Sequence, residues 1–189
     1  MKKKESAKER ILNVASELFY SEGIRAVGID RIIAESEVAK ASFYRNFATK
    51  DDLVVAFLEQ RQIRSLSKVE EAKNLYPDEP VKQLHYLIRI LSESIKHPNF
   101  RGCPFTNTLL EFPDAAHLGH QTALKCRVDH EGEIAKIARQ AKARNPEALA
   151  AQLEMLYGGA IVDAYINKPT FDSHNFYDAA MVLVESQLT

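Results

Sequence analysis

The residues best suited to chemistry in this chain lie close together, in the stretch EVAKASFYRNF at residues 37–47. Lysine and arginine can reach phosphate oxygens or guanine edges, and hydroxyl and amide groups suit phosphate oxygens. The side chains of these types in the stretch are Lys40, Ser42, Tyr44, Arg45 and Asn46. Their composition is that of a nucleic-acid contact, although the solvated face of an ordinary amphipathic helix would carry the same residue types.

Three short helices are predicted to position this stretch. A capping box at Ser6–Glu9 opens the first, whose apolar side runs from Ile11 to Phe19. The second is expected over residues 29–35 and the third over residues 39–47. The second and third are joined by a turn of three or four residues, which is the pattern of a helix-turn-helix.

A recognition helix must pack on one side while its polar side enters the major groove. Val38 and Phe47, with Phe43 in part, can anchor the packed side. Lys8, together with Lys2–Lys4, is expected to lie beside the DNA backbone in a disordered arm. These residues alone do not favour DNA binding over the solvated face of an ordinary amphipathic helix, and both interpretations stay open.

The longer stretch ILNVASELFYSEGIRAVGIDRIIAESEVAKASFYRNFATKDDL, residues 11–53, closely resembles the N-terminal domain of TetR/AcrR-type transcriptional regulators. The features that carry the resemblance are the LF pair followed by Gly23, the K-x-(S/T)-(F/L)-Y-x-x-F core at Lys40–Phe47, and Lys50–Leu53 at the start of the next helix. They stay in register over more than forty residues, so the resemblance is far more specific than a short motif.

The resemblance implies a role for individual residues. Tyr44 and Lys50 would bind phosphates, and Lys40 and Ser42 would contact the DNA backbone or a base edge. The DNA-binding residues implied are Ala39, Lys40, Ala41, Ser42, Phe43, Tyr44, Arg45, Asn46 and Lys50.

The sequence departs from the family pattern at four positions. Glu37 stands where glycine is common, which would cost about 1 kcal/mol if the backbone there is left-handed. Ala39 replaces a serine and forfeits an N-cap of about 1 kcal/mol. Val27 replaces a threonine that would contact phosphate, and Asn46 replaces a histidine. These changes weaken single contacts and leave the assignment in place.

The whole chain is predicted to be all-α, with about nine helices and no convincing strand. Residues 1–50 would form the helix-turn-helix DNA-binding domain, with a formal charge of +3, and residues 51–189 a helical dimerisation and ligand-binding domain, with a charge of −4. The chain lacks a run of 18 apolar residues and a secretory signal, and its two cysteines suggest no disulfide framework. A cytoplasmic protein that contacts no membrane is expected.

Dimerisation is predicted from the stretch LEMLYGGAIVDAYI at residues 153–166, which is apolar nearly all round. Gly158 and Gly159 lie mid-helix, where each costs about 1 kcal/mol against alanine, so close approach of a second helix would compensate. Filling of the chain's own core is the alternative. The predicted interface residues are Leu153, Leu156, Gly158, Gly159, Val162, Phe176, Ala180 and Val184.

The ligand pocket is predicted around RGCPFTNTLLEFPD at residues 101–114, which resembles a segment of one subgroup of these regulators. Apolar residues with a few polar groups could line a cavity, although ordinary core packing explains any one of them more simply. The predicted lining residues are Tyr86, Phe100, Cys103, Phe105, Asn107, Phe112, Leu124, Tyr157 and Tyr165.

Two further kinds of site were weighed. Cys103 would sense electrophiles or oxidants if its thiol were exposed and acidified, but a buried inert thiol explains a single cysteine as well. His117 and His120, three residues apart after Asp114, have a spacing that a metal site can use, and surface histidines are commoner. No metal or cofactor is predicted.

The function predicted is that of a DNA-binding regulator, a ligand-responsive repressor that binds a palindromic operator as a homodimer. Its partners would be double-stranded DNA, a second copy of the chain and an unknown small-molecule effector. An enzyme is disfavoured because the sequence has no GxGxxG, P-loop, HExxH or GxSxG motif. A helical protein-interaction module that has lost DNA binding remains the alternative, given Glu37 and Ala39.

Overall fold

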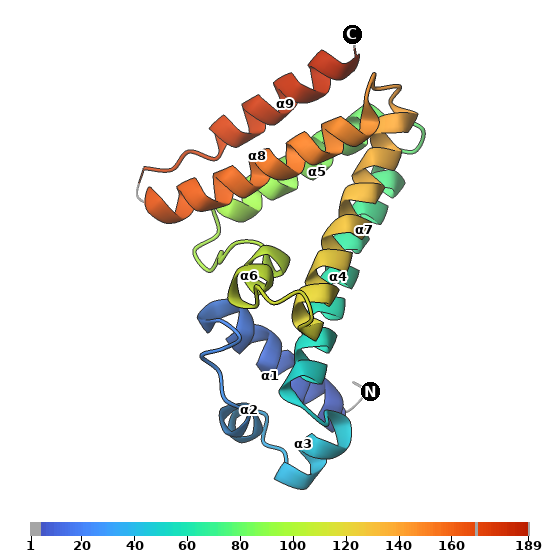
Figure 1. Ribbon diagram of the computed structural model, residues 1–189. Helices are drawn as coiled ribbons and strands as arrows, with labels where there is room; N and C mark the ends of the chain where they lie inside the picture. Colours follow the sequence, from blue (N-terminus) through green and yellow to red (C-terminus); the bar gives the residue numbers. More distant parts are fainter. Residues whose placement is uncertain (1–4, 169, 189) are drawn as a thin grey trace. The chain divides into compact units, whose positions relative to one another are not determined.

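The computed structural model describes residues 5–168 and 170–188 (Figure 1). All of the regular secondary structure in these residues is helical. The nine helices of these residues are α1 (Ala7–Glu22), α2 (Ile29–Glu35), α3 (Lys40–Asn46), α4 (Lys50–Leu75), α5 (Pro80–Ile95), α6 (Pro104–Glu111), α7 (Leu118–Gln140), α8 (Pro146–Ile166) and α9 (His174–Leu188). The prediction of an all-α chain with about nine helices is confirmed. Of the predicted disordered arm, Lys2–Lys4 fall outside the described residues, whereas the inclusion of Lys8 is wrong because Lys8 lies in the first turn of α1.

Side-chain caps begin α1 and α4 as the sequence predicts. Ser6 Oγ accepts from the Glu9 amide at 3.2 Å while the Glu9 carboxylate accepts from the Ser6 amide at 2.7 Å. Thr49 and Asp52 make the same reciprocal pair before α4, at 3.1 and 2.9 Å. These bonds satisfy backbone amides that a helix leaves unpaired. They therefore fix where α1 and α4 begin, the helices that precede and follow α2 and α3 in the chain.

The apolar periodicity of the sequence predicts one long helix over about residues 115–144. α7 is shorter, because it begins at Leu118 and ends at Gln140. At its start, the Asp114 carboxylate accepts from the Ala116 amide at 2.9 Å and holds a turn instead. At its end, Lys142 has a φ of +60°, which a right-handed helix cannot contain. Local turns thus override the apolar pattern at both ends.

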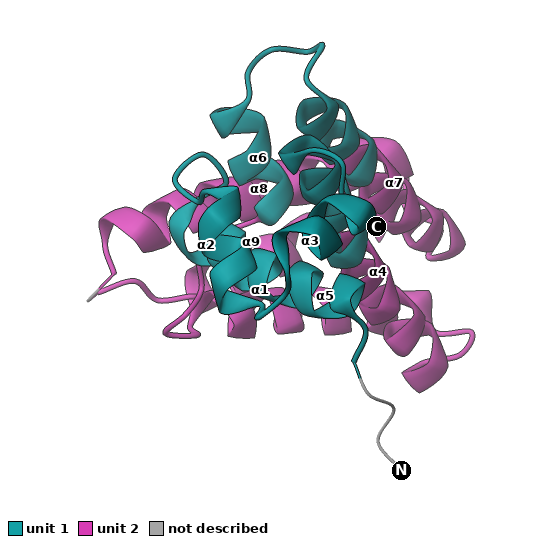
Figure 2. Ribbon diagram, turned by 90° about the horizontal axis from the view of Figure 1, so that it is seen from below, with its two compact units in different colours: residues 1–61, 104–126 teal, residues 62–103, 127–189 magenta. Residues whose placement is uncertain are grey.

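The chain divides into two compact units, coloured separately in Figure 2. Unit 1 contains the described residues as far as Arg61 together with Pro104–Cys126, and unit 2 contains Gln62–Cys103 and the described residues from Arg127 on. α4 and α7 each contribute residues to both units. The compact units divide the chain at positions other than the predicted functional boundary between residues 50 and 51. Compactness does not test a division by function, so that boundary stays a prediction.

Unit 1 is organised around the apolar faces of α1, α2, α3 and the first turns of α4. Phe19 of α1 and Phe57 of α4 meet edge to face, with ring centroids 5.7 Å apart. Aromatic pairs of this geometry contribute about 1 kcal/mol beyond the area that they bury. The largest fully buried side chains of unit 1 are Ile11, Ile24, Ile32, Phe43, Leu53, Phe57 and Leu58. This core supports α3 from one side.

Unit 2 packs α9 against α5 and α8. Its fully buried side chains include Leu84 of α5, Leu149 of α8 and Ala180 of α9. A polar contact crosses the same layer, where the Ser92 hydroxyl lies 3.0 Å from both the carbonyl and the hydroxyl oxygen of Ser173. Buried apolar side chains on all of these helices form the hydrophobic core of unit 2.

Membrane-spanning segments were also considered. None of the helices within residues 5–168 and 170–188 combines the length and the apolar content that crossing a membrane requires.

Candidate nucleic-acid interface

α3 has one buried side and one exposed side. Phe43 and Phe47 are buried, with 0% and 4% of their surface exposed, whereas Tyr44 is 45% exposed. The exposed residues of α3 are Lys40, Ala41, Tyr44 and Arg45. The inclusion of Phe43 among the DNA contacts is therefore wrong, because its side chain has no surface to offer and contacts the Tyr44 ring edge-on at 5.3 Å.

The turn before α3 has a left-handed backbone conformation at Glu37, a residue that is not glycine. Glu37 has a φ of +53°, in the left-handed region that a non-glycine residue enters at a cost of about 1 kcal/mol. Ala39 is the N-cap residue of α3, and no side chain caps the helix there. Val27, where the family carries a threonine, is fully buried in the core of unit 1.

Arg10 of α1 stabilises this turn. Its Nη1 donates to the carbonyls of Ser36 and Glu37, both at 3.3 Å, and the Ser36 hydroxyl donates to the Ile32 carbonyl at 2.6 Å. The carbonyls of a strained turn are thus held by a cation from another helix. Sequence reasoning missed Arg10, and no local pattern could reveal it because the contacts span 26 and 27 residues.

The polar side chains of α3 differ in how readily they can contact a ligand. Lys40 Nζ lies 3.2 Å from Asp30 Oδ1, and both side chains are mostly exposed. An exposed pair of this kind is worth at most about 1 kcal/mol, so a phosphate can replace the carboxylate. Asn46 is half-buried, and its Nδ2 donates to the Ser42 carbonyl at 2.7 Å.

Lys50 is half-buried at the first residue of α4. Its Nζ lies 5.9 Å from the centroid of the Phe19 ring. Burial lowers the pKa of the Lys50 ammonium, while the charges of Glu111 and Asp51 act in the opposite direction.

The C-terminal end of α6 is hydrogen-bonded to the loop that follows α1. Glu111 accepts from the backbone amides of Ile24 and Arg25, at 3.1 and 2.9 Å. This loop begins at Gly23, whose φ of +94° suits glycine, and a Cβ at that position would lie 3.2 Å from the Glu111 carboxylate. Within unit 1, a residue distant in sequence therefore fixes the connection between α1 and α2.

The segment after Glu111 carries the histidines that were weighed as metal ligands. The His117 ring stacks on Phe112 with centroids 4.1 Å apart, and its Nδ1 accepts from the Gly119 amide at 3.0 Å. His120 Nδ1 lies 2.7 Å from the Phe112 carbonyl. Asp114, as noted above, binds a backbone amide. Within the described ranges, no three His, Cys, Asp or Glu side chains are grouped as a metal ion would need.

The residues predicted for the ligand pocket fall in both units. Phe105, Asn107, Phe112 and Leu124 belong to unit 1, and Leu124 is 49% exposed. Tyr86 is buried in unit 2, and its hydroxyl donates to a Glu71 carboxylate oxygen, which is the main reason that its pKa is raised. Cys103 is half-buried. A role of Cys103 in redox sensing stays a prediction.

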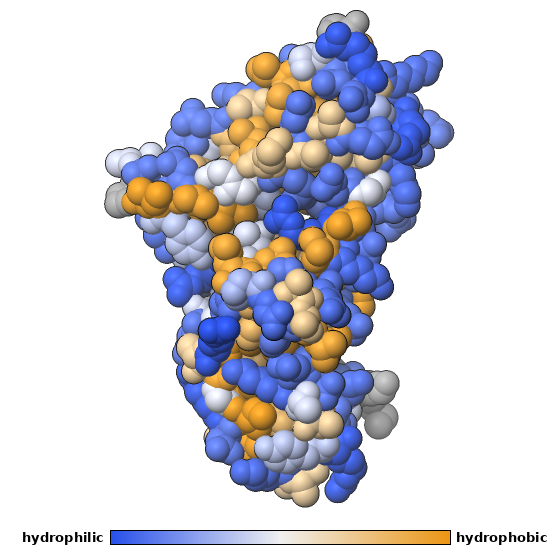
Figure 3. Space-filling model, viewed as in Figure 1, coloured by the Kyte–Doolittle hydropathy of each residue, from blue (hydrophilic) through white to orange (hydrophobic). Residues whose placement is uncertain are grey.

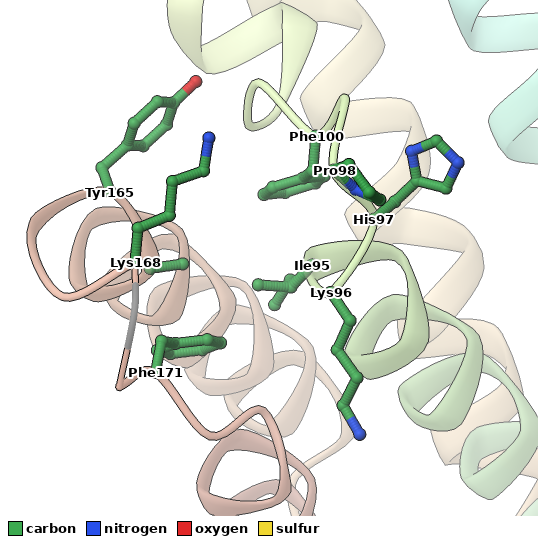
Figure 4. A pocket seen from close by; sticks show the side chains of 9 residues that line it. Ile95, Lys96, His97, Pro98, Phe100, Tyr165, Lys168 and Phe171 are labelled. Atoms are coloured by element: carbon green, nitrogen blue, oxygen red, sulfur yellow. The ribbon is translucent and has the colours of Figure 1, made fainter.

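One pocket of about 260 Å³ brings together two predicted residues, Phe100 and Tyr165, where α5 and α8 end (Figure 4). In Figure 4 the Tyr165 hydroxyl and the Lys168 amine point the same way, while Lys96 points away from both. Helix C-termini carry partial negative charge and Lys168 is a cation, so this pocket favours neither sign of charge clearly.

A second cavity, of about 230 Å³, lies among α4, α5 and α7, and a smaller one of about 30 Å³ reaches α8 and α9. Leu87, Leu91, His130 and Ile134 line both, and the two are called the His130 cavity below. Tyr157 lines the smaller part. His130 was not among the residues predicted from sequence.

The predicted dimer residues also divide into two groups. Phe176, Ala180 and Val184 of α9 are 4%, 0% and 0% exposed, because they pack in the chain's own core. Their assignment to a dimer interface is therefore wrong. Leu153 and Leu156 are half-buried against the same core, and Gly158 is half-buried too. Gly159 and Val162 remain on the surface.

An apolar stripe nevertheless lies exposed on α8, and Figure 3 shows hydrophobic surface over this helix. Its residues Met155, Gly159, Val162 and Ile166 share one helical face, and the three larger side chains are 70%, 57% and 73% exposed. A Cβ at Gly158 or Gly159 would meet no atom of the chain within 4 Å. The chain's own core therefore does not explain these glycines. The stripe is called the α8 face below.

A helix-turn-helix with an exposed, cationic α3 on a buried aromatic base defines a DNA-binding protein, and comparisons with known proteins agree. Residues 11–57 match the sequence profile described as bacterial regulatory proteins, tetR family. The crystal structure of SCO4454, a TetR-family transcriptional regulator from Streptomyces coelicolor, is 33% identical with a TM-score of 0.87, over 97% of this chain and 96% of that one.

Two curated proteins are similar in sequence. The transcriptional regulator AcuR of Cereibacter sphaeroides is 26% identical over 184 residues, which cover 90% of this chain and 81% of that protein. YvkB of Bacillus subtilis, an uncharacterized HTH-type transcriptional regulator, is 32% identical over 90 residues, and the match spans 45% of its length. The chain belongs to the TetR family of DNA-binding transcriptional regulators.

Proposed function

We propose that this regulator is a ligand-responsive repressor, which binds a palindromic operator as a homodimer and releases it when a small molecule occupies unit 2. The observation that carries the proposal is the exposed side of α3. Lys40, Tyr44 and Arg45 are exposed there, and Phe43 of the same helix is buried in the core. Side chains of these types bind phosphates and base edges.

The proposed DNA contacts are the predicted ones without Phe43. Tyr44 would donate to a phosphate through its hydroxyl, and Lys40 would exchange Asp30 for a phosphate. Arg45, exposed in the last turn of α3, would contact phosphate or a guanine edge. Ser42 and Asn46 would add contacts through their half-buried polar groups, and Lys50 would bind phosphate from the start of α4.

The proposed dimer interface is the α8 face, joined by the exposed side of α9 that carries Val182, itself 64% exposed. Exposed apolar stripes on a water-soluble surface are typical of protein contacts. Without side chains at Gly158 and Gly159, a second helix can approach α8 closely. A two-fold pair of chains would present two copies of α3 to the two halves of a palindrome.

Effector binding would act through helices that both units share. α4 begins beside the helix-turn-helix and continues into unit 2, where Ser65 and Lys68 line the His130 cavity. A ligand that binds one arrangement of α4 better than another by a few kcal/mol raises the population of the arrangement that it prefers. The position of the helix-turn-helix changes with that population. The two helix-turn-helix regions of the dimer would then no longer match the spacing of the two half-sites.

Selection of duplexes from a random DNA library by the purified protein tests the proposal. We expect enriched sites with two-fold symmetry, and an affinity that falls with salt by about 0.9 log units per phosphate contact for each log unit of salt. Asymmetric sites would contradict a palindromic operator. A failure to enrich any duplex at low salt would leave the protein-interaction module as the better explanation.

A further inference from the structure

We propose that the effector of the His130 cavity is a small, mostly apolar molecule with one hydroxyl group, and that this hydroxyl donates a hydrogen bond to His130 Nε2. The inference rests on the proposed ligand-responsive function and names the chemical class of its ligand. It is carried by the cavity's aliphatic walls and by the fixed orientation of the histidine.

The cavity walls are largely aliphatic. Leu87, Ile90 and Leu91 of α5 face the cavity together with Ile134 of α7. Transfer of apolar surface from water to such walls contributes about 25 cal/mol per Å². The main part of the ligand is therefore expected to be hydrocarbon or an aromatic ring.

His130 is held by a carboxylate. Its Nδ1 lies 3.1 Å from Glu154 Oε1, and the side chains of both residues are about four-fifths buried, at 20% and 19% exposed. An ionised carboxylate can only accept, so the ring proton is on Nδ1. In the neutral ring, Nε2 is then a lone-pair acceptor, and it is the ring nitrogen that remains for a ligand.

The charges around the cavity are balanced, which favours a neutral ligand. Arg127 Nη2 lies 3.6 Å from Glu154 Oε2, and Lys68 at the rim pairs with Glu71 at 2.7 Å. A carboxylate ligand at His130 would lie close to the negative charge of Glu154. A ligand cation would be repelled by Lys68 and Arg127.

A second polar group in the cavity makes the same demand on the ligand. The Ser94 hydroxyl donates to the Leu91 carbonyl at 2.7 Å, so its oxygen is left to accept. Ser94 therefore adds no donor to the cavity, so a ligand that can only accept finds no partner in either Ser94 or His130. A ligand that can only accept would leave His130 Nε2 buried and unpaired, at a cost that weakens binding.

Two probes that differ in this one donor test the proposal. 4-Propylphenol carries the hydroxyl, and 4-propylanisole replaces its proton with a methyl group. We expect calorimetric titration of the whole protein to give at least about tenfold tighter binding of the phenol, the typical effect of leaving a buried acceptor unpaired. Equal affinities, or no binding of either probe, would overturn the proposal.

Variants place the preference at one residue. His130→Leu should reduce the phenol's advantage to less than about twofold, because no acceptor remains at this position. His97→Asn is the matched control, since it removes an exposed histidine that lines the separate pocket of Phe100 and Tyr165, and it should leave the advantage unchanged. A preference that survives His130→Leu would contradict the assignment.

A measurement on the unaltered protein covers the case in which His130→Leu fails to fold. The imidazole ¹⁵N resonances of the labelled protein should show the Nε2 signal of His130 shifting on addition of 4-propylphenol and not of 4-propylanisole. An unmoved signal during saturable phenol binding would place the ligand elsewhere. Operator binding without any probe is measured separately, so loss of DNA binding would count against the proposed function and not against the ligand class.

Discussion

The two units use helical packing for opposite purposes. In unit 1 the polar side chains proposed to contact DNA lie outside the core, as with Tyr44 and Arg45 on α3. In unit 2 the distinctive polar group, His130, lies inside, and apolar residues such as Val162 lie outside. The comparison teaches that position relative to the core distinguishes a surface suited to contact a polyanion from a cavity that we propose to select a small molecule.

The units also differ in how they tolerate local strain. Unit 1 contains Glu37 at a positive φ and an α3 without a side-chain cap, and a long-range contact from Arg10 holds the carbonyls of the strained turn. Unit 2 contains two glycines inside α8, which cost helix stability and which the single chain does not offset. Unit 1 is thus complete within the chain, whereas unit 2 is completed by a second copy if the proposed dimer is correct.

The largest expected effect follows from Gly159→Arg. A cation on the α8 face should prevent close approach of the second helix and convert dimers to monomers. Operator affinity should fall at least about 100-fold, because the two heads would no longer bind as one unit. Light scattering and fluorescence anisotropy measure both changes. Gly132→Arg on α7 is the matched control, since that glycine is also exposed with no atom within 4 Å of its Cβ position. A dimeric Gly159→Arg protein would remove α8 from the interface.

Tyr44→Phe tests the outward chemistry of unit 1. It removes only a hydroxyl, so the edge-on packing on Phe43 should persist and thermal unfolding should be unchanged. Loss of a hydrogen bond to a charged phosphate is expected to weaken operator binding at least about tenfold. Tyr177→Phe in α9, a half-buried tyrosine of unit 2, should have no effect on operator binding. If both variants bind equally well, Tyr44 does not contact the operator.

Arg10→Met tests whether unit 1 depends on its long-range contact. Loss of the bonds to Ser36 and Glu37 should lower the free energy of unfolding by about 1–2 kcal/mol. Operator affinity should fall as well, because α3 follows this turn directly. Denaturant unfolding and anisotropy measure the two. Arg89→Met, which breaks an exposed pair with Glu93, should change neither by more than about 0.5 kcal/mol.

Glu37→Gly should have a smaller and opposite effect. Glycine adopts a positive φ without steric strain, so the unfolding free energy should rise by up to about 1 kcal/mol. The double variant with Arg10→Met and Glu37→Gly should recover part of the operator affinity that Arg10→Met loses. No recovery is expected if Arg10 acts on a part of the chain other than this turn. A double variant that binds no better than Arg10→Met would separate Arg10 from the turn.

The smallest effect concerns a surface network of unit 2. Hydrogen bonds from Lys136, at 2.6 Å, and from Lys73, at 3.2 Å, lower the pKa of Glu133. A lowered folded-state pKa means that the stabilisation is present above the ordinary glutamate pKa and is lost as the pH falls through the folded value. Glu133→Gln should therefore cost less than about 1 kcal/mol at pH 7, and the cost should shrink below about pH 5. A cost that grows with acidity would reverse this sign.

Much of unit 1 is readable from the sequence because its signals are local. The caps at Ser6 and Thr49, the bounds of α2 and the strained backbone at Glu37 each depend on residues within a few positions. The ends of α7 were misjudged since an apolar period does not reveal the turns that interrupt it. The side of α3 that faces outward was predicted apart from Phe43.

The sequence by itself determined the helices, their order and the cationic helix-turn-helix, because hydrophobic period, caps and turn residues act over one or two turns of chain. Only the tertiary structure decided which apolar faces the chain covers for itself, so that Phe176 proved internal and Met155 external. It also decided the pairs Arg10 with Glu37 and His130 with Glu154, which lie 27 and 24 residues apart. Periodicity identifies an apolar or polar face, but what lies against that face depends on packing between distant segments.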